Sequence, residues 1–458
     1  MKIKLPRIVV AAVSSGGGKT TVVTGLLSAL RQKGLKVQSY KVGPDYIDPG
    51  YHRLASGYPA HNLDSWLMPE DKLREIFIRT SKEADISVVE GVMGLYDGGR
   101  SGVSSTAEIA KLLDAPVVLV IDAKSMGASA AAIALGFREY DPQVKLAGVI
   151  LNRLGSDTHR LMIEKAMQEI GIPVLGAIKR DDSLAMPERH LGLLPVEENQ
   201  RELEAVEAIG RAVVSQTDLV SIIRLADKAG EMELADDSNA VTEDDKIVTI
   251  AVARDDAFSF YYPESLRILE KSGARIILFS PLKDKELPFC DGVILGGGFP
   301  EMFAEALRCN YTMLESIKNA AESGMPIYSE CGGFMYLTQA MIDFDGIEHP
   351  MAGVLPCRVQ MNKKLQMVGY VSAEMNTDTV LGPKGTRLHG HEFHFSSEII
   401  PEKDCRDRAF TFTRMRNNAV YQAGYAWKNV LGSYLHLHFA GCPEAADCFV
   451  EKCKLWRK

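Results

Sequence analysis

The stretch that decides the fold runs from residue 8 to residue 21 and reads Ile8-Val9-Val10-Ala11-Ala12-Val13-Ser14-Ser15-Gly16-Gly17-Gly18-Lys19-Thr20-Thr21. Its first six residues are apolar and favour a buried strand, and an amphipathic helical pattern begins at Thr20. A strand, a glycine-rich turn and a helix that starts at Lys-Thr form the arrangement of a P-loop. In that arrangement, backbone N–H groups and the helix N-terminus face the phosphates of a nucleotide.

The residues of this loop are our candidates for contacting ATP. They are Gly16, Gly17, Gly18, Lys19, Thr20 and Thr21. Lys19 is expected to reach the outer phosphates, and the Thr20 hydroxyl is expected to bind Mg²⁺. The match is imperfect, because Val13 stands where the usual pattern has its first glycine. A glycine-rich turn before an ordinary helix is the alternative interpretation.

Bulk composition limits the class of protein. The chain has 458 residues, of which 46% are hydrophobic and 24% charged, so two or three globular domains are expected. A net charge of −8 argues against a nucleic-acid partner. No apolar run reaches the length of a membrane span. The eight cysteines form no CxxC pair, which argues against a disulfide scaffold or zinc site and favours a reducing cytoplasm.

Strand-like and helix-like segments alternate along the first half, which predicts a parallel α/β domain. The expected strands cover residues 8–13, 37–41, 86–90, 117–121 and 146–151. The expected helices cover residues 20–33, 105–113, 125–140 and 157–170. Strands made almost wholly of Val, Ile and Leu are typical of a sheet with helices on both faces.

Composition changes after residue 226. Residues 227–246 are rich in Asp and Glu and almost lack large apolar side chains, which is typical of a solvated linker. The α/β alternation then resumes, with expected strands at 247–253, 275–279, 293–295 and 326–328 and helices at 263–272 and 332–340. We therefore predict a first domain at 1–228, an acidic linker at 229–245 and a second domain at 246–458.

Polar residues follow the strands of the first domain. Glu90 ends one strand, where ligands of open parallel sheets bind, so it is expected to hold Mg²⁺ directly or through water. The alternative is a capping or surface glutamate. Asp45 and Asp48 lie on a proline-bounded loop that follows another strand. They can hold a metal or meet a substrate, or they can simply form a turn. Asp97 is similarly ambiguous. Asn152 follows a further strand and is either a contact to a nucleotide base or a loop asparagine.

Cys331 is the candidate nucleophile of the second domain. It stands in Ser329-Glu330-Cys331-Gly332-Gly333, between a short strand and a helical pattern, as in a nucleophile elbow. The helix N-terminus favours the thiolate, and Gly332 N–H can stabilise an oxyanion. The glycines at 296–298, among them Gly297 and Gly298, can supply the second oxyanion donor. The alternative is a small buried cysteine with no chemistry.

A thiol nucleophile needs a base, and two histidines are available. His436 and His438 alternate on an expected strand and point to opposite sides, and position alone does not decide between them. A second group, His389-Gly390-His391-Glu392-Phe393-His394, invites a metal interpretation. Its spacing does not match the HExxH helix, so we expect a polar lining of a cleft. A P-loop and a reactive thiol on one chain together suggest ATP-dependent amidation.

The chain resembles the cobyrinate a,c-diamide synthase family along essentially its whole length. The resemblance is carried by several segments in a fixed order: 14–21, 41–49, 89–98, 187–193, 253–263, 296–301, 330–333, 390–394 and 432–439. It implies a dethiobiotin-synthetase-like P-loop domain followed by a class I (triad-type) glutamine amidotransferase α/β domain.

The resemblance also implies roles for individual residues. His436 would partner Cys331, and Asn152 would contact adenine. The carboxylates of the Mg-ATP and acid-activation site would be Asp45, Asp48, Glu90 and Asp97. Ordinary class I amidotransferases carry a glutamate two residues after the catalytic histidine, where this chain has His438. We therefore predict a Cys-His dyad without an orienting glutamate.

The implied reaction amidates the a and c carboxylates of a tetrapyrrole, with ATP, glutamine and Mg²⁺. Cobyrinate is the family's usual substrate, and Ni-sirohydrochlorin and hydrogenobyrinate are alternatives. Cobyric acid synthase, which amidates four other carboxylates, is a rival that fits residues 41–49 and 187–193 less well. A second rival is a regulatory ATPase with an inactive amidotransferase-like domain. A homodimer is compatible with the sequence.

Overall fold

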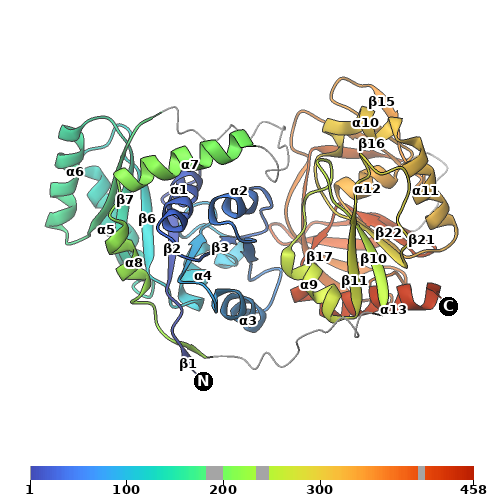
Figure 1. Cartoon of the computed structure of the whole chain (residues 1–458), viewed down its shortest axis with the longest axis horizontal. Helices are drawn as coiled ribbons and strands as arrows, with labels where there is room; N and C mark the ends of the chain where they lie inside the picture. Colours follow the sequence, from blue (N-terminus) through green and yellow to red (C-terminus); the bar gives the residue numbers. More distant parts are fainter. Residues whose placement is uncertain (1, 182–199, 234–246, 401–407, 458) are drawn as a thin grey trace. The chain divides into compact units, whose positions relative to one another are not determined.

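The computed structural model describes residues 2–181, 200–233, 247–400 and 408–457 (Figure 1). These residues separate into two compact units, which we describe one at a time. The first unit contains the described residues up to Glu233, except Trp66–Met68. The second unit contains Trp66–Met68 and the described residues from 247 onward. Residues 187–193, one of the segments that carry the family resemblance, lie outside the described residues.

A seven-stranded, all-parallel sheet forms the centre of the first unit, in the order β4-β3-β5-β2-β6-β7-β8. Its strands are β2 (Arg7–Ala12), β3 (Val37–Val42), β4 (His61–Leu63), β5 (Ile86–Glu90), β6 (Val117–Asp122), β7 (Leu146–Leu154) and β8 (Val174–Lys179). Every residue of β2, β3 and β5 is buried. This confirms the predicted parallel sheet, since only a sheet covered on both faces buries whole strands.

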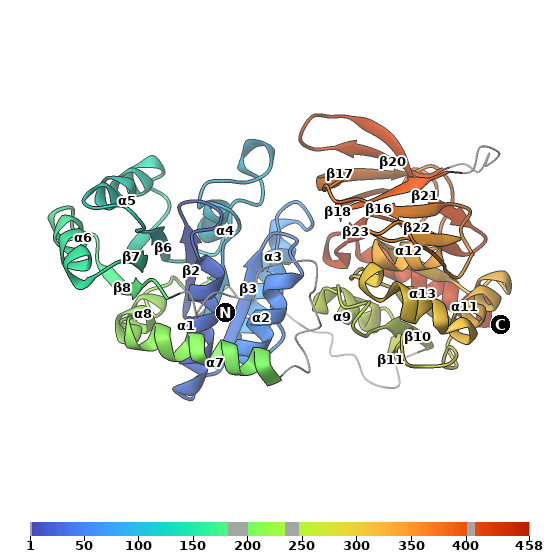
Figure 2. The same ribbon diagram turned by 90° about the horizontal axis from the view of Figure 1, so that it is seen from above.

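The helices of the first unit lie on both sides of this sheet, with α1 and α7 on one face and α3 and α4 on the other (Figures 1 and 2). They are α1 (Lys19–Gln32), α2 (Ile47–Ser56), α3 (Glu70–Ser81), α4 (Thr106–Leu112), α5 (Ser129–Tyr140), α6 (Asp157–Glu169), α7 (Gln200–Ser215) and α8 (Leu219–Ala226). Both views show α7 beside α1. A Cβ atom on Gly25 would lie 2.4 Å from Val213, so glycine permits this close packing.

Two ends of the first unit's chain meet in a small antiparallel pair. Strand β1 (Lys2–Ile3) pairs with β9 (Met232–Glu233), so ordered structure extends into the segment predicted as linker. Residues 234–245 of that segment lie outside the described residues. Arg7 is buried nearby, and its guanidinium donates to the carbonyls of Leu5, Leu113 and Gly230 at 2.6–2.8 Å. These bonds satisfy a buried charge with backbone acceptors.

The second unit is built on a ten-stranded mixed sheet, in the order β11-β10-β12-β13-β22-β21-β20-β17-β18-β23. Its strands are β10 (Val248–Ala253), β11 (Ala274–Phe279), β12 (Gly292–Leu295), β13 (Ile327–Glu330), β17 (Met367–Met375), β18 (Arg387–His394), β20 (Arg408–Arg414), β21 (Val420–Trp427), β22 (Val430–Ser433) and β23 (His436–Leu437). The pairs from β11 to β22 are parallel, and the others are antiparallel.

A smaller four-stranded sheet adjoins this core. It contains β14 (Ala340–Ile342), β15 (Glu348–Pro350), β16 (Arg358–Met361) and β19 (Ser396–Ile399). The helices of the unit are α9 (Pro263–Lys271), α10 (Ala304–Cys309), α11 (Tyr311–Glu322), α12 (Gly332–Leu337) and α13 (Pro443–Arg457), with short 3₁₀ turns η4 (Pro300–Phe303) and η5 (Phe439–Gly441). The predicted helix at 332–340 is wrong at its end, because residues 340–342 pair as strand β14.

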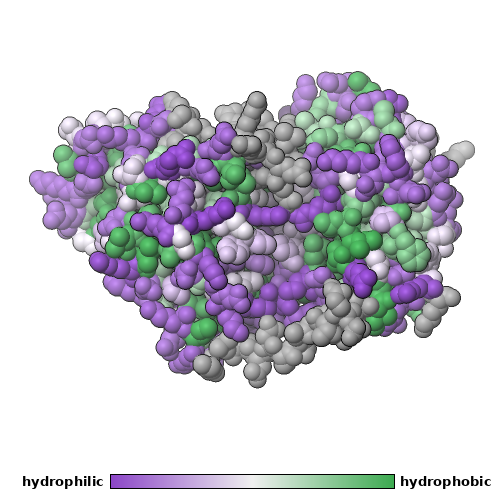
Figure 3. All heavy atoms as spheres, in the orientation of Figure 1, coloured by the Kyte–Doolittle hydropathy of each residue, from purple (hydrophilic) through white to green (hydrophobic). Residues whose placement is uncertain are grey.

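Figure 3 draws one face of the molecule, coloured by the hydropathy of each residue. Hydrophilic and hydrophobic side chains alternate there across each unit (Figure 3). Within the described ranges, no helix has both the length and the apolar character needed to cross a bilayer.

Candidate active site

The glycine-rich loop joins β2 to α1 with the backbone that a P-loop needs. Gly16 and Gly18 have φ angles of 79° and 83°, in the left-handed region that favours glycine. The Lys19 Nζ donates to Met93 O, in the segment after β5, at 2.8 Å. The loop, the α1 N-terminus and this cation therefore lie together at the carboxyl end of the sheet, as the sequence indicates for a phosphate site.

Glu90, the last residue of β5, is the centre of a buried polar cluster. Its Oε1 accepts from Thr20 Oγ1 at 2.8 Å and from Lys41 Nζ at 3.0 Å. Lys41 Nζ also lies 2.8 Å from Asp48 Oδ2 and donates to Gly91 O at 3.0 Å. Lys41, Asp48 and Glu90 are exposed by only 3%, 2% and 0%. The structure thus brings together three residues predicted from separate segments, Thr20, Asp48 and Glu90.

His52 completes this cluster from helix α2. Its Nε2 lies 2.6 Å from Glu90 Oε2, and the ring is fully buried. Both oxygens of Glu90 therefore have partners, as a buried carboxylate requires. Neither His52 nor a role for Lys41 was foreseen from the sequence. Their signal was their spacing, because Lys41 is the next-to-last residue of β3 and His52 lies one helical turn after Asp48 on α2.

Opposing effects set the charges in the cluster. Burial alone would raise the pKa of Glu90, but Lys41 and His52 outweigh it and hold that pKa well below its usual range. Burial alone would lower the pKa of Lys41, but Glu90 and Asp48 raise it above its usual range. Lys41 and Glu90 are therefore both ionised at neutral pH.

Asp45 and Asp97 are placed differently from Asp48. Asp45 Oδ1 accepts from Ile47 N at 2.7 Å, so this carboxylate holds the first turn of α2. Asp97 is exposed on the loop after β5, and its Oδ2 accepts from Gly94 N at 3.1 Å. Both are turn-forming contacts of the kind that the sequence left open as the alternative.

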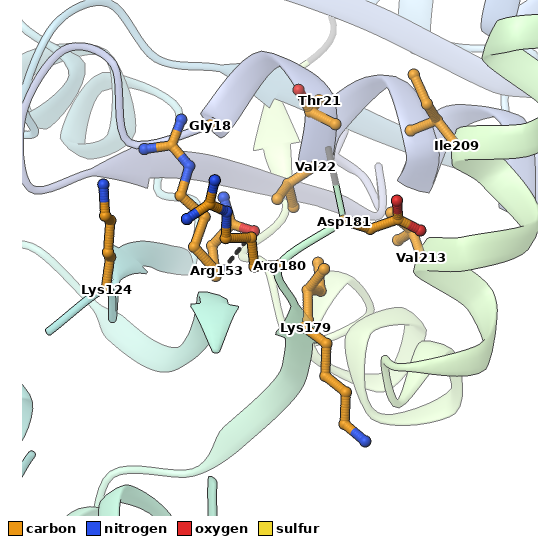
Figure 4. Close-up of a pocket in the computed structure, with 12 residues that line it drawn as sticks. Gly18, Thr21, Val22, Lys124, Arg153, Lys179, Arg180, Asp181, Ile209 and Val213 are labelled. Carbon is orange, nitrogen blue, oxygen red and sulfur yellow. Dashed lines mark hydrogen bonds between the residues drawn. The ribbon is translucent and has the colours of Figure 1, made fainter. Parts of the chain in front are cut away.

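Asn152 lies against the glycine-rich loop. Its Nδ2 donates to Gly17 O at 2.9 Å, and a Cβ on Gly18 would lie 2.2 Å from it. The residue also lines a cavity of about 390 Å³ beside Gly18 and Thr21. Figure 4 shows that cationic side chains gather on one side of this cavity and apolar ones on the other. The cationic residues are Lys124, Arg153, Lys179 and Arg180, and the apolar ones include Ile209 and Val213 of α7.

The donor set around Thr20 fits Mg²⁺, because the ion prefers oxygen ligands and keeps part of its shell for water and phosphate. The fit rests on three oxygen-bearing side chains. The Thr20 hydroxyl donates to the ionised Glu90 carboxylate, and Lys41 bridges Glu90 and Asp48. Among the described residues, no group of three or more His, Cys, Asp or Glu side chains is arranged to hold a metal by itself. That includes the histidines of β18.

In the second unit, Cys331 occupies a strained turn between β13 and α12. Its φ and ψ are 45° and −101°, a conformation that non-glycine residues rarely adopt. Its N–H donates to Ser433 O at 2.8 Å, which fixes the turn on the neighbouring strand β22. Its Sγ lies 3.7 Å from Phe393 O. A small thiol held in this geometry matches a nucleophile elbow.

The glycine loop after β12 packs against the first residues of α12. A Cβ on Gly332 would lie 3.1 Å from Gly298 N, so these two residues are in close contact. Gly333 N donates to Gly296 O at 2.9 Å and ties α12 to the glycine loop after β12. A Cβ on Gly297 would lie 2.7 Å from His436 Cε1. The structure therefore gathers four predicted residues, Gly297, Gly298, Gly332 and His436, around the Cys331 turn.

The two histidines of the 436–438 pair differ in their contacts. His438 Nδ1 accepts from Ala440 N at 3.2 Å and caps η5. His436 is paired in register with His391 of β18, and the two rings stack at 4.8 Å. Of the two, only His436 is placed by a contact with the glycine loop. His394, in the same β18 segment, stacks on Tyr434 at 3.7 Å.

A glutamate does approach His436, although it does not come from the position two residues after the histidine. His438 occupies the place two residues after His436, as expected. Glu330, the residue before the nucleophile, lies 3.6 Å from His436 Nδ1 through its Oε2. The dyad without an orienting glutamate stays a prediction, and the approach of Glu330 was not foreseen from the sequence. The physical reason is that β13 and β23 bring together residues 106 positions apart, which spacing along the chain does not show.

Charges near Cys331 oppose its ionisation. Burial raises the pKa of the Cys331 thiol above its usual range, and Glu301 and Glu330 add to the effect. Burial also raises the pKa of Glu301 to about 7. The sequence analysis missed Glu301 as a functional candidate, although it directly follows the glycine loop in Gly298-Phe299-Pro300-Glu301. A thiolate at this site therefore needs a base and a hydrogen-bonding environment.

The two halves define the chain as a P-loop nucleotide-binding unit joined to a thiol amidotransferase unit. Residues 8–194 match the CobQ/CobB/MinD/ParA nucleotide binding domain, and residues 249–443 match the CobB/CobQ-like glutamine amidotransferase domain. This confirms both predicted domain types.

Full-length relatives identify the family. The chain is 43% identical over 465 residues to a cobyrinate a,c-diamide synthase of Dehalococcoides mccartyi, with 99% of both chains covered. It is 40% identical over 441 residues to one of Methanobrevibacter smithii, covering 95% of this chain and 96% of that one. It is also 40% identical to a hydrogenobyrinate a,c-diamide synthase of Streptomyces coelicolor, with 98% of both covered. The chain belongs to the cobyrinate a,c-diamide synthase family.

Proposed function

We propose that this protein is an ATP-dependent ligase that amidates the a and c carboxylates of cobyrinate, with glutamine as the nitrogen donor. One observation carries the proposal: a single chain holds the Thr20–Glu90–Asp48 cluster at a P-loop and the Cys331 elbow beside His436. The first can activate an acid with ATP, and the second can release ammonia from glutamine. The names of the relatives support the choice of substrate.

The glutaminase half-reaction begins at Cys331. The thiol gives its proton to His436, and the sulfur attacks the side-chain amide carbon of glutamine. The N–H groups of Gly332 and Gly298 stabilise the resulting oxyanion. His436 then gives the proton to the leaving nitrogen, and ammonia departs. Water hydrolyses the glutamyl thioester to glutamate and restores the thiol.

The synthetase half-reaction makes the substrate carboxylate electrophilic. The carboxylate attacks the γ-phosphorus of ATP, and ADP leaves. Lys19 and the N–H groups of Gly16–Gly18 hold the phosphates and offset the charge that moves during transfer. Mg²⁺, held by Thr20 with Glu90 and Asp48, would supply further charge neutralisation at the phosphates. Ammonia then attacks the acyl phosphate, and phosphate leaves as the amide forms.

Asp45, Asp97 and Asn152 enter the proposal on the family resemblance. Asp45 and Asp97 would meet the carboxylate or its activated form, and Asn152 would contact adenine from the lining of the 390 Å³ cavity. The seven cysteines among the described residues are all free, which supports a reducing cytoplasm as the location. The homodimer stays a prediction.

The direct test uses Cys331→Ala. The variant is expected to lose glutamine-dependent amidation and to keep ammonia-dependent amidation with Mg-ATP. A wild-type protein with no glutaminase activity, in the presence of nucleotide and each candidate tetrapyrrole, would favour the regulatory ATPase instead.

Product mass spectrometry settles the substrate. Wild-type protein is incubated with Mg-ATP, glutamine and one of cobyrinate, hydrogenobyrinate or Ni-sirohydrochlorin, and the mass change is read for each. Two amidations of cobyrinate are expected. Two amidations of Ni-sirohydrochlorin alone would move the protein to nickel-cofactor biosynthesis, and four amidations of a corrinoid would identify a cobyric acid synthase.

A further inference from the structure

Glu330 and His436 form a buried pair inside the second unit. Glu330 ends β13, and His436 begins β23. The distance from Glu330 Oε2 to His436 Nδ1 is 3.6 Å, and both residues are nearly inaccessible to solvent. Because water is excluded, a carboxylate at this distance acts on the imidazole far more strongly than a surface pair would.

The Glu330 carboxylate is fixed by two hydrogen bonds on its other oxygen. Tyr328 donates from its hydroxyl to Oε1 at 2.5 Å, and Leu437 donates from its backbone N–H to the same atom at 3.1 Å. The second donor is the residue that follows His436, so the carboxylate is tied to the backbone that carries the histidine. These two bonds leave the other oxygen, Oε2, facing the imidazole of His436.

The ring of His436 is held on its other sides as well. His391 stacks on it with ring centres 4.8 Å apart and planes 10° apart, and Gly297 touches its Cε1 edge. Burial lowers the pKa of His391 well below its usual range, and His436 adds to the effect. His391 is therefore neutral, and Glu330 supplies the negative charge facing the ring.

We propose that Glu330 is a positioning residue for His436, supplied from the position before the nucleophile instead of two residues after the histidine. It directs Nδ1 toward itself, leaves Nε2 to exchange a proton with Cys331, and stabilises the imidazolium formed when the thiol ionises. Glu330 itself gains and loses no proton in the cycle. The inference rests on the glutaminase half of the proposed function.

The charges around Cys331 and His436 decide the direction in which the pH profile should move. His436 faces Glu330 and His391, while Cys331 is influenced by Glu301, Glu330 and Glu392 from three other elements. Removing the Glu330 charge makes the imidazolium less stable and the thiolate more stable. The pKa of the Cys331 thiol therefore falls, and the limb of the pH profile that reports this thiol moves to lower pH.

The experiment measures kcat and KM for glutamine hydrolysis by wild type and Glu330→Gln from pH 5 to 10. We expect kcat to fall about 10- to 100-fold, as for a lost partner of a catalytic base, with KM for glutamine nearly unchanged and the profile displaced to lower pH. Tyr328→Phe keeps the carboxylate and its charge but removes one anchor, so kcat should fall by a smaller factor while the pH profile stays near that of wild type. It also keeps the inference testable if Glu330→Gln does not fold.

Glu398→Gln is the matched control. It removes a half-buried carboxylate of the same unit that binds Arg408 and Tyr425 instead of a histidine. Its pH profile should coincide with that of wild type. An active wild type with an unchanged kcat in both Glu330→Gln and Tyr328→Phe would overturn the inference while leaving the glutaminase intact. A wild type without glutaminase activity would instead overturn the proposed function.

Discussion

His52 Nε2 lies 2.6 Å from Glu90 Oε2, inside the first unit and out of contact with water. The other Glu90 oxygen, Oε1, accepts from Thr20 and Lys41, so His52 fixes the carboxylate rotation that presents Oε1 to Thr20. His52→Ala would leave Oε2 buried without this donor. We expect a loss of stability of about 1–3 kcal/mol and weaker Mg-ATP-dependent amidation.

The measurement for His52→Ala is urea unfolding together with ammonia-dependent amidation over a range of Mg²⁺ concentrations. Glutaminase activity should stay at the wild-type level. His349→Ala is the control, because it breaks a histidine–carboxylate contact of similar length, to Asp343 at 2.8 Å, in the second unit. Equal losses of amidation in the two variants would show that His52 has no special relation to the nucleotide site.

Lys41→Met is expected to be among the most destabilising single substitutions in the first unit. Lys41 Nζ lies 2.8 Å from Asp48 and 3.0 Å from Glu90, and all three are buried. Removing the cation leaves two buried carboxylates facing each other, at a cost of about 3–5 kcal/mol. Lys111→Met removes an exposed pair with Asp141 and should cost less than about 1 kcal/mol. Urea unfolding of both variants measures the two losses of stability. Equal midpoints would contradict the special cost of removing Lys41.

The same cluster sets an acid limit on stability. The pKa of Glu90 is lower in the folded protein than in an unfolded chain, where it is about 4.3. Its contribution is therefore complete above that value and is lost as the pH falls toward the folded pKa. Thermal unfolding from pH 3 to 7 should show wild type losing stability below about pH 4.3 more steeply than Glu90→Gln. Parallel curves would contradict this assignment.

Asp48→Asn tests the division of labour between the two units. Asp48 lies in the Thr20–Glu90 cluster of the first unit, while Cys331 belongs to the second unit, so the substitution should reduce ATP-dependent amidation by about 10-fold or more. Formation of the glutamyl thioester at Cys331, followed by mass spectrometry, should be unchanged. A parallel loss of both half-reactions would indicate a folding defect instead.

Structural features that depend only on neighbouring residues could mostly be predicted from the sequence. The β2–loop–α1 arrangement, the end of β5 at Glu90 and the elbow at Cys331 each depend on neighbours along the chain: an apolar strand, glycines and a helix start. Such signals survive without knowledge of the tertiary fold. The predicted elements therefore differ from the structure mainly at their ends, such as the helix at 332–340.

The missed residues act through contacts between distant segments. Lys41 meets Glu90 across 49 residues, and Glu330 meets Leu437 across 107. Neither pairing follows from hydrophobic period or motif spacing, because it depends on which strands the topology places side by side. His52 is a further example, since a buried histidine on an amphipathic helix resembles many core histidines until its partner is known.

Glu301 is expected to restrain the reactivity of Cys331 in a pH-dependent way. Burial raises the pKa of Glu301 to about 7, so its negative charge appears mainly above that pH. That charge raises the pKa of the Cys331 thiol. Glu301→Gln should therefore speed alkylation of Cys331 by iodoacetamide above pH 7 and change it little below pH 6. The exposed Glu305→Gln is the control, and identical rate–pH curves for Glu301→Gln and wild type would refute the effect.

Gly297→Ala tests how closely the backbone must approach His436. A Cβ at Gly297 would lie 2.7 Å from His436 Cε1 and 3.2 Å from a Phe260 ring carbon, so either the ring or the glycine loop must shift. A displacement of about 1 Å at a catalytic base costs about 100-fold in rate, and glutaminase kcat should fall by that order. Gly136→Ala, on α5 with no neighbour within 4 Å of the added Cβ, should leave both half-reactions unchanged. Full glutaminase activity in Gly297→Ala would mean that the imidazole tolerates movement, which would also weaken the case for Glu330 as its anchor.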